Sequence, residues 1–353
     1  MIKPNKYIEK INVYQLAVKD RNNKIRLDLN ENTLGCSPKV IEVLKNAKIS
    51  DVAFYPEYDE LIRKIALKYA ILPQNILLTN GGDDAIRCVI QTYVNSNELV
   101  LITEPTFSMF EIQLMLQNAL IKKIFYKEDF LFPFKDFYDF LSKRVKLAVI
   151  VNPASPIGTA IDSEQLVKIL RKAQENETAI ILDETYYHFN KRTYIKLIEE
   201  FDNLIVSHSF SKAYGLAGIR LGFIASNREN IAQMQKVNLP YAVNSLAVIA
   251  GNIAIEDDEH LNKVVQNVEN GKRYLLRELR MIGLDAINTA TNFILVKCKK
   301  SSFKVVAGLR EKNILVKEFP NDKLLKDYIR ISIGSHQENE ELIKALKQII
   351  DSI

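Results

Sequence analysis

The segment Ser209–Gly222 carries residue types that could bind a phosphate beside a reactive amine. Ser209 and Ser211 precede Lys212, and Arg220 follows eight positions later. A guanidinium offers a planar fork to phosphate oxygens, and serine hydroxyls offer short neutral donors. A lysine amine can form a Schiff base with a carbonyl compound. A lysine after a short strand is more often only an exposed side chain, so the hypothesis of a site depends on the rest of the chain.

Short apolar runs elsewhere in the chain are typical of buried strands. They cover residues 100–102, 147–151, 180–182 and 204–206. Helical patterns alternate with them, which indicates an α/β fold with a mostly parallel sheet. Ligands of such sheets bind outside the carboxyl ends of the strands. We therefore expect the polar residues that follow these runs, such as Asn152, Asp183 and Tyr186, to converge.

A pair of glycines, Gly81 and Gly82, joins the strand predicted over 76–79 to the helix predicted over 85–93. Backbone N–H groups at a helix N-terminus attract anions. Gly82 and Asp83 are therefore candidates for one side of a phosphate site. For this pair alone, a plain turn with an aspartate cap is the commoner explanation.

The length of 353 residues exceeds what one hydrophobic core usually supports, so we predict two domains. Residues 36–250 form the expected large domain, and residues 251–353 form a small α+β domain. Residues 1–35 form an N-terminal arm that joins the small domain. The strands predicted for that domain cover residues 293–296, 314–316 and 328–333.

Charge and cysteine usage narrow the function classes. The net charge of +5 is spread along the chain without a basic block, which gives little support to nucleic-acid binding. Cys36, Cys88 and Cys298 lie far apart and have no metal-ligand spacing to the histidines, so we predict neither disulfides nor a metal site. No signal-peptide core and no apolar run of spanning length is present, so we expect a cytoplasmic protein without membrane contact.

Eight motifs stand in one order along most of the chain. They are Asn30-Glu31-Asn32-x-Leu34-Gly35, Tyr55-Pro56, Asn80-Gly81-Gly82-Asp83-Asp84, Pro105-Thr106-Phe107, Asn152-Pro153-x-x-Pro156-x-Gly158, Asp183-Glu184-x-Tyr186, the segment Ser209–Gly222, and Tyr328-Ile329-Arg330-Ile331-Ser332-Ile333-Gly334. In type and order they resemble the fold-type I, pyridoxal-phosphate-dependent aminotransferases, and within them the histidinol-phosphate aminotransferases. The resemblance implies a large domain with a mostly parallel sheet, a small α+β domain, pyridoxal 5'-phosphate as cofactor, and a homodimer with shared active sites.

The resemblance also implies catalytic roles for Lys212, Asp183 and Tyr186. Lys212 would hold the cofactor as a Schiff base and, once displaced by substrate, would carry a proton. Asp183 would pair with the pyridine nitrogen and keep it protonated. Tyr186 and Asn152 would hydrogen-bond the oxygen on the cofactor ring.

The remaining cofactor contacts are implied in the same way. Phe107 would stack on the ring, although a core phenylalanine explains this position nearly as well. Tyr55 would reach the phosphate bound by the neighbouring subunit. The phosphate contacts within the subunit would come from Gly82, Asp83, Ser209, Ser211 and Arg220.

Substrate contacts are implied for Arg330, Lys317, Tyr14 and Asn32. Arg330 resembles the arginine that binds the α-carboxylate of glutamate and, in the histidinol-phosphate enzymes, the substrate phosphate. Those enzymes typically have a second arginine where this chain has Lys317, which keeps the charge but loses the bidentate fork. Other departures from the family pattern in or near the pocket are Val13, Ala154, Ser155 and Ala242.

These features predict an aminotransferase that moves an amino group between glutamate or 2-oxoglutarate and a small phosphorylated amine or ketone. Histidinol phosphate is one candidate, and the pair dihydroxyacetone phosphate and serinol phosphate is another. A decarboxylase of a phosphorylated amino acid, similar to the threonine-phosphate enzymes, would use the same Lys212 and Asp183. A non-catalytic regulator is a remote alternative, because the chain retains Lys212 and shows no segment for a DNA-binding module.

Overall fold

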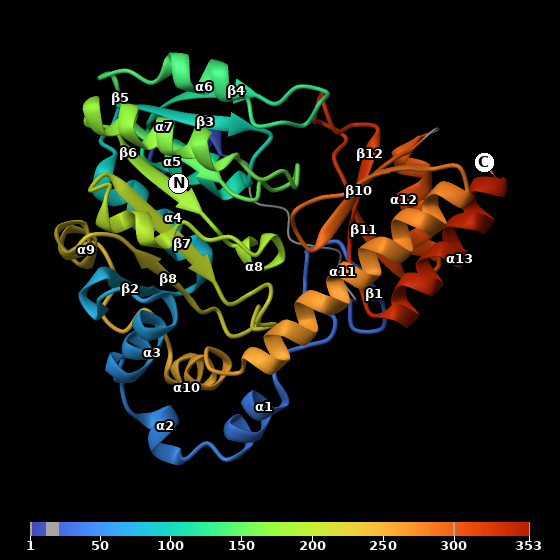
Figure 1. The fold of residues 1–353 in the computed structure, drawn as a ribbon, viewed down its shortest axis with the longest axis horizontal. Helices are drawn as coiled ribbons and strands as arrows, with labels where there is room; N and C mark the ends of the chain where they lie inside the picture. The colour runs from blue at the N-terminus through green and yellow to red at the C-terminus, as the bar shows by residue number, and fades with distance from the viewer. Residues whose placement is uncertain (1, 12–20, 299–300, 353) are drawn as a thin grey trace.

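Two β-sheets organise the chain in the computed structural model, which describes residues 2–11, 21–298 and 301–352 (Figure 1). The large sheet consists, in spatial order, of β2 (Ile76–Thr79), β8 (Gly222–Ala225), β7 (Leu204–Ser209), β6 (Ala179–Asp183), β5 (Val145–Val151), β3 (Leu99–Glu104) and β4 (Leu120–Phe125). The small sheet consists of β1 (Ile25–Leu27), β11 (Ile314–Glu318), β12 (Tyr328–Ser332), β10 (Phe293–Lys297) and β9 (Asp285–Ile287).

The large sheet is mostly parallel, as the sequence predicts. Only β8 runs antiparallel to its neighbours β2 and β7. In the parallel part, Val151 pairs with Asp183, and Asp183 pairs with Ser207. This register brings the carboxyl ends of β5, β6 and β7 to one edge, where the polar residues that follow them meet.

Helices cover both faces of the large sheet. One face packs against α4 (Gly81–Tyr93), α5 (Ser108–Leu116) and α9 (Arg228–Gln235), and its core includes Val149, Ile181 and Ile205. The opposite face packs against helices that include α7 (Ser163–Glu175), and its core includes Ile150, Leu182 and Val206. Neighbouring residues of each strand are thus buried on opposite sides, which explains why these strands read as continuous apolar runs.

The other helices of the described chain include the two longest, α11 with 24 residues and α13 with 17. They are α1 (Pro38–Lys45), α2 (Ile49–Ala53), α3 (Asp59–Tyr69), α6 (Phe134–Phe140), α8 (Tyr187–Asn190), α10 (Ser245–Ala254), α11 (Asp258–Met281), α12 (Ser302–Glu311), α13 (His336–Ser352) and the 3₁₀ turns Ile8–Lys10, Pro73–Asn75 and Ile195–Glu199. Figure 1 shows α11 running from the region of α1 and α10 to the small sheet. The small sheet receives β1 of the N-terminal arm, which pairs in parallel with β11.

Four strands have no counterpart in the sequence-based prediction, and one of them is the 3-residue β1 of the N-terminal arm. β4 is an edge strand in which Lys122 and Lys123 interrupt the apolar pattern, as is common for edges that must not pair further. β8 and β9 are only 4 and 3 residues long, too short for a periodic signal. Helix α4 begins at Gly81, so the glycine pair forms the first turn of the helix and not a turn before it.

Candidate active site

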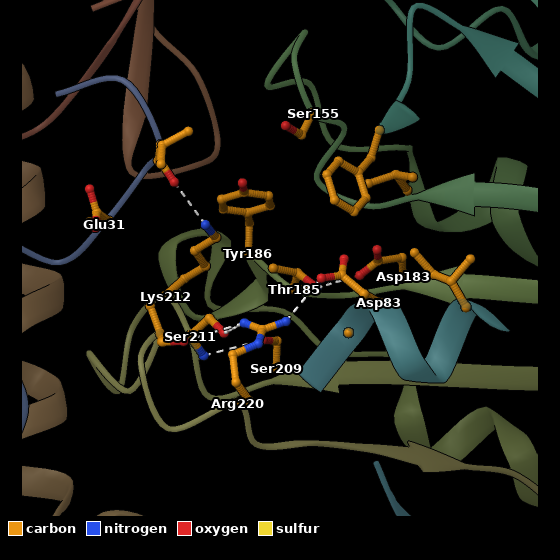
Figure 2. Close-up of a pocket in the computed structure, with 16 residues that line it drawn as sticks. Glu31, Asp83, Ser155, Asp183, Thr185, Tyr186, Ser209, Ser211, Lys212 and Arg220 are labelled. Carbon is orange, nitrogen blue, oxygen red and sulfur yellow. Dashed lines mark hydrogen bonds and ion pairs between the residues drawn. The ribbon is translucent and has the colours of Figure 1, made fainter. Parts of the chain in front are cut away.

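A cavity of about 230 Å³ lies at the carboxyl ends of β5, β6 and β7 (Figure 2). Most of the residues predicted to bind the cofactor line it. The lining residues are Leu29, Glu31, Gly82, Asp83, Ile86, Phe107, Val151, Ser155, Asp183, Thr185, Tyr186, Ser209, Ser211, Lys212, Ala217 and Arg220.

One end of the cavity is built to receive an anion. Arg220 places Nη2 2.9 Å from Asp83 Oδ2 and Nη1 3.5 Å from Ser211 Oγ. The first turn of α4 lies beside this guanidinium. Gly81 has φ +78°, a conformation that favours glycine, and a Cβ on it would lie 2.7 Å from Arg220 Nη2, so a larger residue here would displace the guanidinium. A phosphate group would fit here, because the helix N-terminus, the guanidinium and the serine hydroxyls all offer hydrogen-bond donors to it.

The floor of the cavity holds a buried carboxylate. Asp183 is only 5% exposed, and its Oδ1 accepts a hydrogen bond of 2.9 Å from Thr185 N. Burial raises the pKa of Asp183, while the hydrogen bonds from Thr185 act against this rise. None of the described cationic side chains forms an ion pair with Asp183. Such a carboxylate would stabilise a positively charged ring nitrogen placed against it.

Asn152 follows β5 and is fully buried. Its Oδ1 accepts a hydrogen bond of 3.0 Å from Ile161 N, whereas its Nδ2 has no partner in the described structure. An unpaired buried donor is costly and unusual in a folded protein. This amide is therefore a ready donor for a ligand oxygen.

Lys212 and Tyr186 face each other across the cavity. Lys212 Nζ donates to Leu29 O at 2.9 Å and lies 5.9 Å from the centre of the Tyr186 ring. Asn30 Nδ2 lies 2.8 Å from the Tyr186 hydroxyl. Burial alone would raise the pKa of Tyr186, but the positive charges of Lys212 and Arg330 and two hydrogen bonds together lower it.

Two cations of the small sheet lie side by side, and one of them, Arg330, contacts a residue of the cavity wall. Lys317 and Arg330 are direct partners across the antiparallel β11–β12 pair. Arg330 donates from Nη2 to Asp28 O at 2.8 Å, and its Nη1 lies 3.4 Å from Ser155 Oγ, a residue of the cavity wall. Desolvation, followed by the charge of Arg330, lowers the pKa of Lys317.

Comparisons with known proteins agree with this geometry. The model of the family "Aminotransferase class I and II" matches residues 22–346. The chain belongs to this family. It is therefore a pyridoxal-phosphate-dependent transaminase, as the resemblance in the sequence predicts.

Several relatives of this aminotransferase are named histidinol-phosphate aminotransferase. Histidinol-phosphate aminotransferase 2 of Carboxydothermus hydrogenoformans is 32% identical over 92% of this chain and 91% of the relative. Histidinol-phosphate aminotransferase of a Thermoanaerobacter species is 31% identical over 93% of each chain.

Solved structures share the fold of this aminotransferase. Histidinol-phosphate aminotransferase of Sinorhizobium meliloti, crystallised with pyridoxal-5'-phosphate, covers 100% of this chain and 98% of its own with a TM-score of 0.92 and 22% identity. L-threonine-O-3-phosphate decarboxylase of Porphyromonas gingivalis covers 93% of this chain and 99% of its own with a TM-score of 0.80 and 23% identity. At these identities the likeness concerns the fold and not the substrate.

Together with Asn152, which follows the lining residue Val151 but is not itself in the wall, the residues of the cavity fit the family's cofactor. The anion end suits the phosphate, Asp183 suits the ring nitrogen, and the unpaired Nδ2 of Asn152 can donate to an oxygen on the ring. Among the residues that line the cavity, Lys212 is the one lysine. Phe107 also lines the cavity, where a ring could stack on it.

Other predicted site residues lie apart from this cavity. Tyr55 is 76% exposed and stacks on Tyr241. Asn32 donates from Nδ2 to Gly35 O and Ala213 O, which ties the turn of the arm to the loop of Lys212. Tyr14 lies outside the described residues.

Sequence reasoning did not single out several residues of the site. Leu29 and Glu31 line the cavity, and Asn30 contacts Tyr186 although it is not in the wall. Thr185 also lines it, as does Ser155, which the sequence analysis named only as a departure from the family pattern in or near the pocket. Leu29 directly precedes the first quoted motif and the others stand inside the motifs, so their proximity to the predicted site residues in the sequence was the available signal.

Two absences hold for the part of the chain that the structure describes. Every helix in it is too short or too polar to span a lipid bilayer. Its His, Cys, Asp and Glu side chains form no group of three that could hold a metal ion.

Proposed function

We propose that this aminotransferase moves an amino group between glutamate or 2-oxoglutarate and a small phosphorylated amine or ketone, with histidinol phosphate as the leading candidate. The observation that carries the proposal is the pair Lys317 and Arg330, which oppose each other across β11 and β12. Like charges in directly opposed positions destabilise a sheet. Asp28 and Glu318 offset part of this repulsion at Lys317. A phosphate bound there, with its charge of almost −2, would offset more of it than a carboxylate would.

The cofactor, when bound, supplies a ring that withdraws electrons from the substrate Cα. In this proposal Asp183 holds the ring nitrogen in its charged form through its buried carboxylate. Asn152 Nδ2 and the Tyr186 hydroxyl hydrogen-bond the ring oxygen. Lys212 Nζ takes the proton from the substrate Cα, and the Leu29 carbonyl, 2.9 Å away, orients this amine.

The substrate side of the proposal depends on Arg330. Its hydrogen bonds to Asp28 O and Ser155 Oγ fix the guanidinium beside the cavity wall. There it would bind the carboxylate of glutamate and the phosphate of the second substrate in turn. Lys317 would add a second positive charge without the bidentate fork of an arginine.

A homodimer with shared sites is the second part of the proposal. Tyr55 is 76% exposed and stacks on Tyr241 with a centroid distance of 4.2 Å. Exposed apolar side chains in the same two stretches of chain, 49–55 and 239–241, are Ile49, Val52, Phe54 and Leu239. A second copy that covers this surface would remove it from water and bring Tyr55 to the neighbouring phosphate. Light scattering of the purified protein should give twice the mass of one chain.

A half-reaction titration tests the substrate assignment. Glutamate should bleach the visible absorption band of the cofactor-bound protein, and imidazole-acetol phosphate should restore it. The unphosphorylated ketone dihydroxyacetone serves as a control that should fail at the same concentration. Recovery only with dihydroxyacetone phosphate would move the assignment to a shorter substrate. A band that glutamate never bleaches would favour the decarboxylase, whose machinery is the same.

A further inference from the structure

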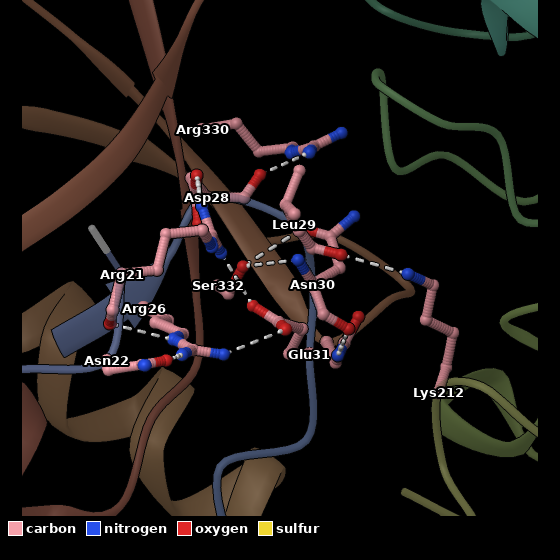
Figure 3. A network of polar contacts seen from close by, with 11 residues as sticks. Arg21, Asn22, Arg26, Asp28, Leu29, Asn30, Glu31, Lys212, Arg330 and Ser332 are labelled. Carbon is pink, nitrogen blue, oxygen red and sulfur yellow. Dashed lines mark hydrogen bonds and ion pairs between the residues drawn. The ribbon is translucent and has the colours of Figure 1, made fainter. Parts of the chain in front are cut away.

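The residues 28–31, here called the strap, contact three different groups of the proposed site in sequence order. Figure 3 shows the first two contacts, with Arg330 and Lys212. Asp28 O accepts from Arg330 Nη2 at 2.8 Å, and Leu29 O accepts from Lys212 Nζ at 2.9 Å. Asn30 Nδ2 lies 2.8 Å from the Tyr186 hydroxyl. One short segment of the arm therefore connects Arg330 on β12 with Lys212 and Tyr186, which the proposed function assigns to the cofactor.

Asn30 is held rigidly inside this segment. It is 1% exposed and has φ +55°, a conformation that asparagine tolerates better than most residues. Its backbone N donates to Ser332 Oγ at 2.9 Å, and its backbone O accepts from Asn292 Nδ2 at 3.0 Å. Ser332 stands two positions after Arg330 on β12, so both side chains lie on the same face of that strand.

The hydrogen bonds around Ser332 determine which way the Asn30 amide points. Ser332 Oγ already accepts the proton of Asn30 N, so it uses its own proton to donate to Asn30 Oδ1 at 3.0 Å. The oxygen of the amide thus faces Ser332, and the NH₂ group faces Tyr186. Tyr186 therefore receives a hydrogen bond on its oxygen, and its own proton stays available for a partner in the cavity.

We propose that Asn30 is a positioning residue, which holds the Tyr186 oxygen as a hydrogen-bond acceptor and ties it to the strand that carries Arg330. The proposal rests on the proposed function, in which Tyr186 contacts the cofactor. A donor at the oxygen of a phenol stabilises the phenolate. Asn30 therefore works in the same direction as the other groups that face Tyr186, which are the cations Lys212 and Arg330 and the hydroxyl of Ser155.

The test is the ionisation of Tyr186 in the cofactor-bound protein. It can be followed by NMR of protein with ¹³C-labelled tyrosine, using the ring signal that disappears in Tyr186→Phe. Asn30→Asp fits the same backbone conformation and still accepts from Ser332, but it cannot donate to Tyr186. We expect the titration midpoint of Tyr186 to rise by about one pH unit or more, a tenfold change in proton affinity.

Two further variants guard against misfolding of Asn30→Asp and against a general effect of substitution in this segment. Asn30→Gly also accepts a positive φ and removes the amide without burying a charge, so it should raise the midpoint even if Asn30→Asp folds poorly. Asn32→Asp is the matched control, because its side chain binds Gly35 O and Ala213 O instead of Tyr186. It should shift the midpoint several-fold less.

The proposal is overturned if Tyr186 titrates as in the unmodified protein in both Asn30 variants, or if Asn32→Asp shifts it equally. Neither result depends on whether glutamate bleaches the visible band. Failure of this inference and failure of the proposed function can therefore be told apart.

Discussion

The two sides of the cavity are built in different ways. On the cofactor side, Asp183, Asn152 and Lys212 come from or directly after neighbouring strands of one parallel sheet. On the substrate side, the strap, Ser155, Lys317 and Arg330 come from the arm, a loop of the large sheet and two strands of the small sheet. A side chain at a strand end is fixed by the register of a rigid sheet, whereas the substrate side depends on how separate parts of the chain pack together. This chain departs from the family pattern mainly on the substrate side, at Ser155 and Lys317.

The largest expected effect tests the cofactor side. Lys212→Ala should abolish the visible band and reduce turnover by at least about 10⁴-fold, because both the attachment of the cofactor and the proton carrier are lost. Absorbance spectra and steady-state rates measure the two losses. Wild-type transamination by this variant would exclude the assigned role of Lys212 and with it the distinction between the two sides.

Asp183→Asn should reduce turnover by about 10³-fold or more while the fold persists, because the amide oxygen can still accept from Thr185 N but no longer carries a charge. Rates and thermal unfolding should be compared at one pH. A loss below tenfold would mean that the ring nitrogen has another partner.

The same variant gives a pH prediction for the protein without cofactor. Burial raises the pKa of Asp183, so ionisation of this carboxyl costs folding stability, and the cost appears as the pH rises through the raised pKa. Asp183→Asn lacks an ionising group and should lack this decline. Thermal unfolding of the cofactor-free proteins between pH 4 and about pH 8 measures it, and identical curves for both would contradict the prediction.

A smaller and more selective effect should come from the substrate side. Lys317→Ala should raise the KM for the phosphorylated ketone by about 10- to 100-fold, the worth of a charge-assisted hydrogen bond. The KM for glutamate should rise less, because a carboxylate carries about half the charge. Lys317→Arg is the matched control and should retain low KM values. Equal changes for both substrates would remove the proposed phosphate specificity.

The smallest effect is expected at the surface. Tyr55→Phe should weaken cofactor retention by about fivefold, the worth of one hydrogen bond. The dissociation constant of the cofactor measures this loss. Mixing this variant with Lys212→Ala should restore a fraction of activity if each site combines residues of two chains. Absence of recovery, together with unchanged cofactor affinity, would contradict a role for Tyr55 in a shared site.

Much of the cofactor side could be predicted from the sequence. The apolar runs define the parallel strands, and the motifs that follow them name Lys212, Asp183, Asn152 and Tyr186. The start of α1 follows a local rule of the same kind, because Ser37 caps the helix and Pro38 is its first residue. These features depend on short stretches of chain, in which residue type and spacing decide the local structure.

Only the tertiary structure decided the rest. β4 and β8 were missed because an edge strand with lysines and a four-residue strand have too little pattern to be recognised. The opposition of Lys317 and Arg330 depends on the register of β11 and β12, and the contact between Asn30 and Tyr186 joins residues 156 positions apart. The sequence by itself determined which side chains can do the chemistry. Packing of the arm and the small sheet against the large sheet decided which of them face the same cavity, because such contacts depend on how distant segments fit together and not on their spacing in the chain.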